Sequence, residues 1–466
     1  MEIQILSVDI ERFDASTRMP FKYGIATMTH LPHVFLRADV NFDGVNQKGI
    51  SADHLPPKWF TKDPEKDPLE EIEDMLVVIE NAGKLAQRIT SDSVFNFWRE
   101  LYQLQDDWAT NSFTPHLLAH FGTSLIERAL IDAFCRHQGR TFAHLLHENS
   151  FGIHWDSIRP ELKGKEPKDL FPVPLESITI RHTVGMADPL TEEEISEDER
   201  IHDGLPQSLE NCIQFYGVNH FKIKVKGQLE PDIERLGTIE NLFNRLNLVD
   251  FAFTLDGNEQ FHEVSTFREF WNSLQESERM RTFFEHLVFV EQPFHRDLAL
   301  TEPIGVALKS WTQAPPIIID ESDATLDSAF TALQLGYSGT SHKNCKGVFK
   351  GIINRAMINQ RNLDAGTSRF LMSGEDLANI GPVANHMDLV VQACLGNASV
   401  ERNGHHYFKG LSLFNASTQE SAFKSFPDMY VSENNCVRLN IRNGVLPVHE
   451  LLSFPFGTDN SHFCVF

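Results

Sequence analysis

Short apolar segments that end on a charged side chain recur along the second half of this sequence at intervals of 23 to 35 residues. The segment FAFTLD is apolar until Asp256, LVFVE until Glu291 and PIIID until Asp320. Further segments of the same kind end at Lys224, Lys343, Glu375 and Glu401. A (β/α)8 barrel of about 250 residues repeats one strand–helix unit roughly every 31 residues. The recurrence therefore predicts an α/β chain built around a barrel of this type.

Eight barrel strands are expected between residues 174 and 436, which we take as the catalytic domain. They lie in SITIRHTV, HFKIKVKG, FAFTLDG, LVFVEQP, PIIIDES, GYSGTSHKN, RFLMSGED and NASVERNG. The carboxyl ends of all strands in such a barrel meet at one mouth, where active sites lie. Charged residues that are far apart in the sequence are therefore expected to share one pocket.

Residues 1–150 carry a different pattern, which predicts a separate α+β domain. IQILSVDIERF and HVFLRADVNF alternate apolar and polar residues as half-buried strands do. Helical periodicity follows in residues 67–90 and 121–146. One face of the second helix carries small and apolar residues that allow close packing, namely Ile126, Ala129, Leu130 and Ala133. The polar stretch 150–172 is typical of a linker.

Composition excludes several classes of partner. The chain has 41 Lys and Arg against 65 Asp and Glu, which gives a formal net charge of −24 and makes nucleic acid and anionic membranes poor partners. The 6 cysteines are far apart without a C-x-x-C pair, which excludes a disulfide framework or a zinc ribbon. There is no run of 18 apolar residues, no basic leader, no Walker loop and no G-x-G-x-x-G. We therefore expect a cytoplasmic protein that does not bind nucleotides.

Three carboxylates from consecutive strands predict a metal centre. Asp256, Glu291 and Asp320 together carry a charge of −3, and in one pocket they would repel each other or take up protons. A divalent cation removes this conflict, and ligands that are all oxygen favour Mg²⁺ over zinc. The alternative is that each acid separately ends a strand at the surface.

Lysines accompany these acids. FKIKVKG places Lys222, Lys224 and Lys226 on one face of a strand because strand side chains alternate. Lys343 ends strand six, which faces strand two across an eight-stranded barrel, and Lys346 follows it. We expect Mg²⁺ and neighbouring ammonium groups to lower the pKa of one amine, so that it can act as a base. The alternative is a set of solvated lysines that pair with the acids.

These motifs identify a resemblance. KIK, DGN, EQP, DES and KNCKG occur in this order and at barrel spacing. In these motifs the sequence resembles the enolase superfamily, in its mandelate racemase and muconate lactonizing enzyme branch. SLIERALIDAFCRHQGRTFAHLL is similar to the helix that closes the family's capping domain. The resemblance covers nearly the whole chain. It implies that residues 1–150 cap the barrel and that the tail, residues 437–466, returns to the cap as strand and loop.

The resemblance implies a chemistry. Asp256, Glu291 and Asp320 would bind Mg²⁺, and Lys224 and Lys343 would form an acid/base pair. The family abstracts a proton α to a carboxylate and gives an enediolate that the metal holds. An arrangement with lysines on both sides of the site is similar to that of muconate lactonizing enzymes, dipeptide epimerases and succinylbenzoate synthases. The His–Asp dyad of mandelate racemase is missing. Racemisation, elimination of water and cycloisomerisation all begin this way, so the reaction and the small carboxylate substrate stay open.

The resemblance also implies substrate contacts. Lys222 would contact the substrate carboxylate or steady Lys224. The ends of strands seven and eight supply candidates for substrate binding or for ion pairs with the lysines, namely Glu375, Asp376 and Glu401. Specificity would come from the capping domain, where Tyr23 and His54 are candidates, and a homo-oligomer is implied.

Other readings remain open. A silent barrel that only binds or supports other molecules has the same fold, and isotope exchange would distinguish it from an enzyme. A metallohydrolase barrel would need histidine ligands such as His-x-His on strand one, where only His182 is present. The acidic segment 186–207 is longer than usual for a barrel loop and is either a lid or a solvated insertion.

Overall fold

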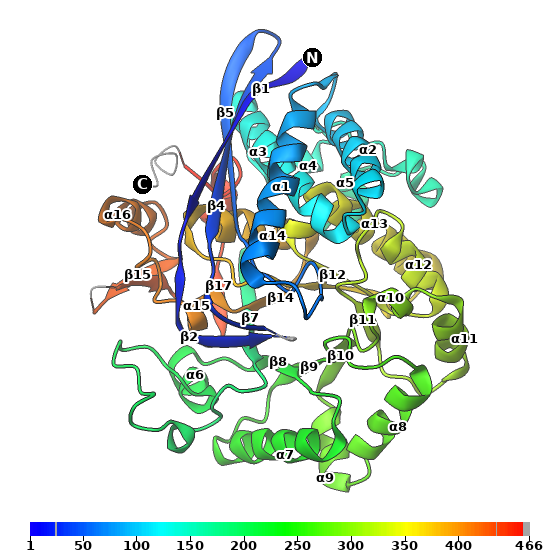
Figure 1. Cartoon of the computed structure of the whole chain (residues 1–466), viewed down its shortest axis with the longest axis vertical. Helices are drawn as coiled ribbons and strands as arrows, with labels where there is room; N and C mark the ends of the chain where they lie inside the picture. The colour runs from blue at the N-terminus through cyan, green and yellow to red at the C-terminus, as the bar shows by residue number, and fades with distance from the viewer. Residues whose placement is uncertain (24–25, 435, 460–466) are drawn as a thin grey trace.

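The computed structural model describes the whole chain except residues 24–25, 435 and 460–466. An antiparallel sheet with three long helices forms one part, and a closed parallel barrel forms the other (Figure 1). None of the helices among the described residues is long and apolar enough to cross a membrane.

The first part is built on a four-stranded antiparallel sheet in the order β5-β4-β1-β6. Its strands are β1 (Ile3–Phe13), β4 (His33–Phe42), β5 (Val45–His54) and β6 (Thr90–Ser91). A separate hairpin, β2 (Ser16–Tyr23) and β3 (Ala26–His30), leaves this sheet and reaches the barrel (Figure 1). This hairpin carries the first domain's side chains to the barrel mouth.

Helices α1 (Pro68–Ala86), α2 (Val94–Ser112) and α3 (His116–Gln138) cover the sheet, and α4 (Phe142–His147) follows. The small face predicted for α3 is buried and allows a close approach to β5. A Cβ atom on Gly49 would lie only 2.0 Å from the carbonyl oxygen of Ala129. Helix α3 is buried almost all round, because the barrel covers the face that the sheet leaves free.

Eight parallel strands close the barrel through pairing of the last strand with the first, from Ser399 opposite Thr179 to Arg402 opposite His182. The strands are β7 (Ser177–Val184), β8 (His220–Lys224), β9 (Ala252–Asp256), β10 (Leu287–Glu291), β11 (Ile317–Ile319), β12 (Gly339–His342), β13 (Leu371–Gly374) and β14 (Ser399–Arg402). Each lies in its predicted segment, so the predicted barrel is confirmed.

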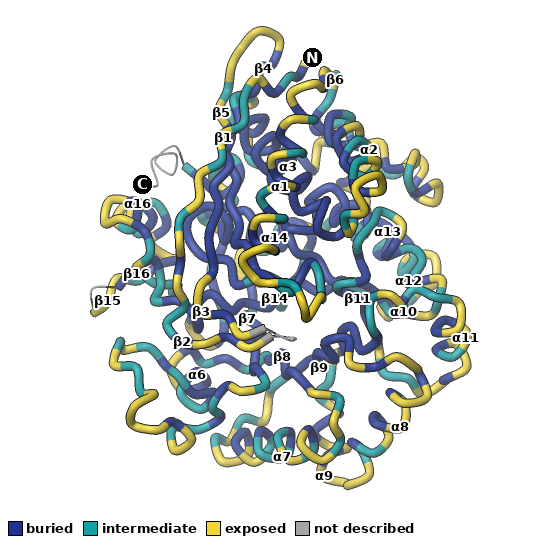
Figure 2. The backbone as a smooth tube through the Cα atoms, in the orientation of Figure 1, coloured by how far each residue is buried: buried dark blue, intermediate teal, exposed yellow. Residues whose placement is uncertain are grey.

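Helices surround the barrel, and most of them expose an outer face (Figure 2). They are α6 (Leu209–Tyr216), α7 (Leu229–Arg245), α8 (Val264–Leu274), α9 (Glu278–Phe284), α10 (Arg296–Ala299), α11 (Glu302–Ser310), α12 (Ser328–Leu335), α13 (Val348–Ala365), α14 (His386–Leu395), α15 (Gly404–Tyr407) and α16 (Ala416–Ser425). In contrast, α14 and α15 are buried along their whole length. A short helix, α5 (Pro167–Leu170), lies in the segment expected to be the linker.

The tail differs from the expectation. After the hairpin β15 (Tyr430–Glu433) and β16 (Cys436–Leu439), strand β17 (Val445–Pro447) pairs antiparallel with barrel strand β7 rather than with the first domain's sheet. The loop that follows contacts the first domain, where the Phe142 amide donates to the carbonyl of Pro455 (2.7 Å) and Arg136 donates to the hydroxyl of Thr458 (2.6 Å). Within the described residues, the tail thus reaches the first domain through this loop, whereas its strand extends the barrel sheet.

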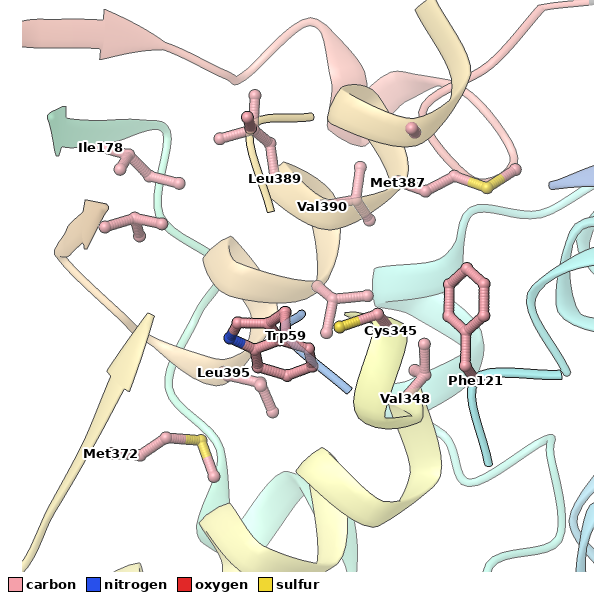
Figure 3. Close-up of a cluster of buried hydrophobic side chains, with 14 of the residues drawn as sticks. Trp59, Phe121, Ile178, Cys345, Val348, Met372, Met387, Leu389, Val390 and Leu395 are labelled. Carbon is pink, nitrogen blue, oxygen red and sulfur yellow. The ribbon is translucent and has the colours of Figure 1, made fainter. Parts of the chain in front are cut away.

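Buried side chains from both parts form one continuous core. Figure 3 shows Trp59 and Phe121 of the first domain with Cys345 and Val348 of the barrel in the same cluster. A buried carboxylate crosses the same interface, because Glu127 of α3 accepts hydrogen bonds from the amides of Val348 (3.0 Å) and Phe349 (2.6 Å). These amides begin α13, so the first domain caps a barrel helix.

The insertion 186–207 holds the hairpin. Arg18 of β2 donates to both carboxylate oxygens of Asp203 (2.7 and 2.8 Å) and to the carbonyls of Leu205, Pro206 and His406. No residue of the insertion lines the cavity at the barrel mouth. The segment therefore acts on that cavity through the hairpin, which it anchors.

Candidate active site

A cavity with about 650 Å³ of empty space lies at the carboxyl ends of the barrel strands, beneath the first domain. The barrel supplies most of its charged walls, with Lys222, Lys224, Asp256, Asp320, Lys343, Asp376 and Glu401. The first domain supplies apolar walls through Phe21, Met28, Pro56 and Trp59. Seven of the eleven residues predicted for the site thus meet in one cavity.

Two interlocked loops hold the strand ends of β9 and β10. The amide of Gly257 donates to the carbonyl of Glu291 (2.9 Å), and that of Glu259 donates to the carbonyl of Gln292 (2.8 Å). A Cβ atom on Gly257 would lie 2.6 Å from the Cα of Pro293, which explains glycine within the DGN motif. Gln292, with a φ of +36°, then accepts from the amide of Asp320 (2.7 Å) and so fixes the next strand end. Left-handed backbone at a residue other than glycine is typical of such functional loops.

Lys222 lies at the centre of four carboxylates. Its ammonium donates to Glu291, Glu375 and Glu401 at 2.9 Å each and lies 3.2 Å from Asp256. Burial opposes the charged form, but the carboxylates outweigh burial and raise the pKa of Lys222. Lys222 therefore neutralises the cavity floor, which differs from the substrate contact that the resemblance implies.

Lys224 lies one step higher on β8, at the mouth. Its ammonium donates to Oδ2 of Asp256 (2.7 Å) and to Oδ1 of Asn258 (3.0 Å). Lys226, which the alternation placed on the same face, lies beyond the strand and is exposed. Only the first two lysines of the motif therefore reach the cavity.

Lys343 enters from the opposite side, directly after β12. It donates to Oδ2 of Asp320 (2.5 Å), and its ammonium lies 5.1 Å from the ring centre of Trp59. Lys346 donates to the other oxygen, Oδ1 of Asp320 (3.1 Å). Burial opposes the charge, but Asp320 outweighs it and raises the pKa of Lys343. The sequence analysis expected a lowered amine pKa, whereas the pKa of Lys343 is raised in this structure.

The donor set of the predicted metal centre fits Mg²⁺. Asp256, Glu291 and Asp320 end consecutive strands and offer only oxygen ligands, which Mg²⁺ prefers. Oε2 of Glu291 is buried without a hydrogen-bond partner among the described residues, although the Lys222 ammonium lies 2.8 Å away. Burial and the neighbouring Glu375 raise the pKa of Glu291 well above its usual range. A cation at these oxygens would relieve this accumulation of negative charge.

Lysine ammonium groups contact these carboxylate oxygens in this structure. Within the described part of the chain, the three-residue sets whose ligand atoms lie within 4.8 Å of one another do not include Asp256, Glu291 and Asp320. Each of these acids lies within 3.2 Å of at least one lysine ammonium. Binding of Mg²⁺ would therefore exchange lysine contacts for metal contacts.

The acids of strands seven and eight take different positions. Glu375 is fully buried below the cavity, where it accepts from Arg181 (2.5 Å) as well as from Lys222. Asp376 and Glu401 line the cavity. Burial raises the pKa of Asp376 to about 7 even though Arg402 lies 3.3 Å away. Of the two predicted roles of Glu375, substrate binding and an ion pair with a lysine, its position fits the ion pair with Lys222 (2.9 Å).

The sequence predicts substrate contacts for two residues of the first domain, His54 and Tyr23. His54 is completely buried, stacks on Phe408 (ring centres 5.2 Å apart) and faces His33, whose Nδ1 lies 3.3 Å from its own. It does not line the cavity, so the prediction that it contacts substrate is wrong. Tyr23 lies next to residues 24–25, and its side chain lies outside the described part of the structure.

Part of the cavity wall is formed by residues that the sequence analysis does not predict. Glu321 lines the cavity, and burial together with Asp320 raises its pKa to about 7. Arg296 binds Glu259 with both ends of its guanidinium (2.7 and 2.9 Å) and also holds the carbonyl of Trp59. The DES motif contains Glu321, and DGNE contains Glu259, so proximity to the predicted ligands was the available signal.

Comparisons of the sequence alone find nothing. No protein-family model matches the chain, and no curated protein matches it.

Solved structures share the fold over nearly the full length. An enolase from Bradyrhizobium, complexed with magnesium and mandelic acid, aligns with a TM-score of 0.59 over 99% of this chain and 97% of its own, at 13% identity. The L-Ala-D/L-Glu epimerase from Bacillus subtilis aligns at 0.57 over 95% and 97%, with 17% identity. Muconate lactonizing enzyme from Pseudomonas fluorescens, complexed with muconolactone, aligns at 0.55 over 84% of both chains, with 16% identity. The chain therefore shares the fold of these structures over nearly its full length.

Proposed function

We propose that this chain is a Mg²⁺-dependent member of the enolase superfamily that removes the proton α to the carboxylate of a small acid. The acid/base pair would be Lys224 and Lys343, and the enzyme would be an isomerase or a lyase. Structures of the same fold include an N-succinyl Arg/Lys racemase from Bacillus cereus and a dipeptide epimerase from Enterococcus faecalis complexed with Mg and a dipeptide. These likenesses support the proposal at the level of fold.

One observation carries the proposal. Lys224 and Lys343 leave strands β8 and β12, which lie on opposite sides of the closed barrel, and both ammonium groups line the same cavity. Each is held by a carboxylate predicted to bind metal, Asp256 at 2.7 Å and Asp320 at 2.5 Å. A substrate carbon between the two lysines would present one face to each.

The metal would be held by Asp256, Glu291 and Asp320. When bound, Mg²⁺ supplies positive charge that stabilises negative charge developing on the substrate carboxylate. Lys222 has a separate role, because it neutralises Glu375 and Glu401 at 2.9 Å and so keeps the acidic floor folded.

The two lysines would move protons at the α-carbon. Lys343, whose nitrogen lies 2.5 Å from Oδ2 of Asp320, would give a proton to one face of the α-carbon. Lys224 would take the α-proton from the opposite face, with Asn258 Oδ1 3.0 Å from its nitrogen to orient it. In a racemase the two roles exchange with the substrate enantiomer.

The first domain would exclude water from this reaction. Trp59 is 7% exposed and lies over Lys343, while Phe21 and Met28 of the hairpin are also buried against the cavity. Apolar walls strengthen the electrostatic interactions of the groups that they enclose. The hairpin and the segment around Trp59 would therefore set substrate shape.

The test is α-hydrogen exchange. The protein is incubated with Mg²⁺ in D₂O and a panel of acid sugars, N-acyl amino acids and dipeptides, and deuterium at the α-carbon is measured by mass spectrometry. The proposal predicts Mg²⁺-dependent exchange into at least one compound class. Binding of a panel compound without exchange would favour the alternative, a silent barrel that acts as a binding or structural protein.

A further inference from the structure

We propose that His182, Cys212 and His406 form a zinc site that is separate from the carboxylate cavity. His182 lies on β7, Cys212 on α6 and His406 on α15, so the three side chains come from segments far apart in the chain. This proposal does not rest on the proposed enzymatic function.

The geometry suits a tetrahedral ion. One potential ligand atom from each residue lies within 4.8 Å of the other two. Sγ of Cys212 is 3.4 Å from Nδ1 of His406. Zinc bonds of about 2.3 Å to sulfur and about 2.0–2.1 Å to nitrogen place tetrahedral ligand atoms about 3.4–3.6 Å apart. The cysteine–histidine pair is thus already at the required spacing, and the His182 ligand atom lies within 4.8 Å of both.

The site is buried and its ligands are of the right type. The exposed fractions are 2% for His182, 0% for Cys212 and 2% for His406. Two imidazoles and a thiolate favour a borderline or soft metal over Mg²⁺. Buried polar groups need partners, and these three contact mainly one another and a further imidazole. A metal ion would satisfy all of them at once.

Coordination would use a lone pair of one nitrogen in each neutral imidazole and the thiolate form of Cys212. Zinc binding would break the S–H bond, form a zinc–sulfur bond and release one proton to solvent. Arg18, Asp188 and Glu192 are the charged groups nearest to this thiol, two acids against one guanidinium.

A second histidine supports the first. Nε2 of His405 lies 3.1 Å from Nδ1 of His182, which is the contact by which outer partners orient a metal-binding ring. Nδ1 of His405 is itself buried without a hydrogen-bond partner among the described residues. His405 is 7% exposed.

Other groups of ligating residues are less suitable. Asp106, His116 and His120 already share hydrogen bonds of 2.7 and 3.0 Å to one carboxylate oxygen, with Asp106 and His116 partly exposed. The set of Asp428, His449 and Glu450 is largely exposed. Among the three such sets in the described residues, only the one with Cys212 is buried and contains sulfur.

The site would brace the cavity wall. Tyr407 follows His406, and its ring stacks on Phe21 of the hairpin with centres 4.1 Å apart. Phe21 lines the cavity. A metal that ties β7, α6 and α15 together would therefore hold the support on which this part of the hairpin rests.

The first test measures zinc content. The full chain is produced in medium with added ZnCl₂, because a buried site fills most readily as the chain folds, and zinc is measured after gel filtration in excess Mg²⁺. The proposal predicts one zinc per chain in the natural protein and in Cys394→Ser, which changes another buried free cysteine. Cys212→Ser should lose most of this zinc. Zinc absent from the natural protein, or equal in Cys212→Ser, would overturn the proposal.

A second test covers the case in which Cys212→Ser does not fold. The natural protein is produced with CoCl₂ in place of zinc, and its absorption spectrum is recorded. A near-ultraviolet thiolate-to-cobalt band with the visible bands of tetrahedral Co²⁺ is expected. Visible bands of six-coordinate Co²⁺ without the thiolate band would place the metal at oxygen ligands and contradict the proposal.

Discussion

At the residue scale, the candidate active site is governed by compensation between buried charges. Lys222, Lys224 and Lys343 each lie within hydrogen-bond distance of a carboxylate, and their exposed fractions are 3%, 7% and 3%. An unpaired buried charge costs several kcal/mol, so loss of one partner from any of these contacts would destabilise the folded chain. The same groups would then serve metal binding and proton transfer.

We predict that Asp256→Asn weakens Mg²⁺ binding. The substitution removes one anionic ligand and the counter-charge of Lys224, so the loss should exceed the roughly 10–100-fold cost of removing an outer partner. Isothermal titration with MgCl₂ measures it. Glu259→Gln is the matched control, because Glu259 lines the same cavity but pairs with Arg296. Equal Mg²⁺ affinity in Asp256→Asn and the natural protein would reject the ligand assignment.

At the element scale, the hairpin depends on Arg18. Its guanidinium is 5% exposed and joins β2 to the insertion 186–207 through Asp203 and the carbonyls of Leu205 and Pro206, and to α15 through the carbonyl of His406. Strand β2 carries Phe21 into the cavity wall. The insertion therefore has a positioning role even though it does not cover the cavity itself.

Arg18→Ala should free the hairpin. We expect faster protease cleavage between residues 16 and 30 and, on a substrate found by exchange, a KM about tenfold higher, because ordering the wall then costs on the order of 1 kcal/mol. Arg12→Ala on β1 is the control, since Arg12 pairs with the exposed Glu73. Cleavage at the same rate in all three proteins would show that Arg18 does not anchor the hairpin.

Helix α13 should make stability depend on pH through Glu127. Burial outweighs the two amide hydrogen bonds and raises the pKa of Glu127 to about 7, so the folded state holds this proton more tightly than the unfolded state. Stability from this group is full below the unfolded pKa of 4.5 and is lost as pH rises toward about 7. The loss is on the order of 3 kcal/mol.

Urea unfolding at several pH values measures this effect. Between pH 4.5 and about 7, the unfolding free energy of Glu127→Gln should fall by about 3 kcal/mol less than that of the natural protein, because Asp376 and Glu321 still contribute to the fall. Glu73→Gln, at an exposed position, should keep the full fall. Parallel pH profiles for the natural protein and Glu127→Gln would mean that Glu127 keeps an ordinary pKa in the folded state.

At the scale of the whole molecule, the sequence predicts those features that repeat along the chain. The barrel strands are short apolar runs with a charge at the end, and the closed sheet follows this rhythm from β7 to β14. The tail is predicted to return to the cap as strand and loop. The loop does so, but strand β17 pairs with the barrel, because three residues, Val445–Pro447, carry no pattern that selects between two sheets. His54 was misplaced because a strand end gives no sign of whether its ring faces the cavity or the core.

The sequence does not predict contacts between residues that only the folded barrel brings together. The lysines were located correctly, but the four carboxylates around Lys222 come from β9, β10 and the ends of β13 and β14, and only the closed barrel brings them together. The cluster of His182, Cys212 and His406 was missed for the same reason, since the sequence shows each residue separately. The homo-oligomer that the resemblance implies stays a prediction.

Stereospecific exchange by single-lysine variants tests the central claim most directly. Lys224→Ala and Lys343→Ala are incubated with Mg²⁺ and each enantiomer of an exchanging substrate in D₂O, and α-deuterium is followed by NMR. Both variants should lose turnover, while each retains exchange with at most one enantiomer, because the remaining lysine reaches only its own face. Full turnover in both variants would contradict the account and direct attention to Asp376 and Glu401 in the same cavity.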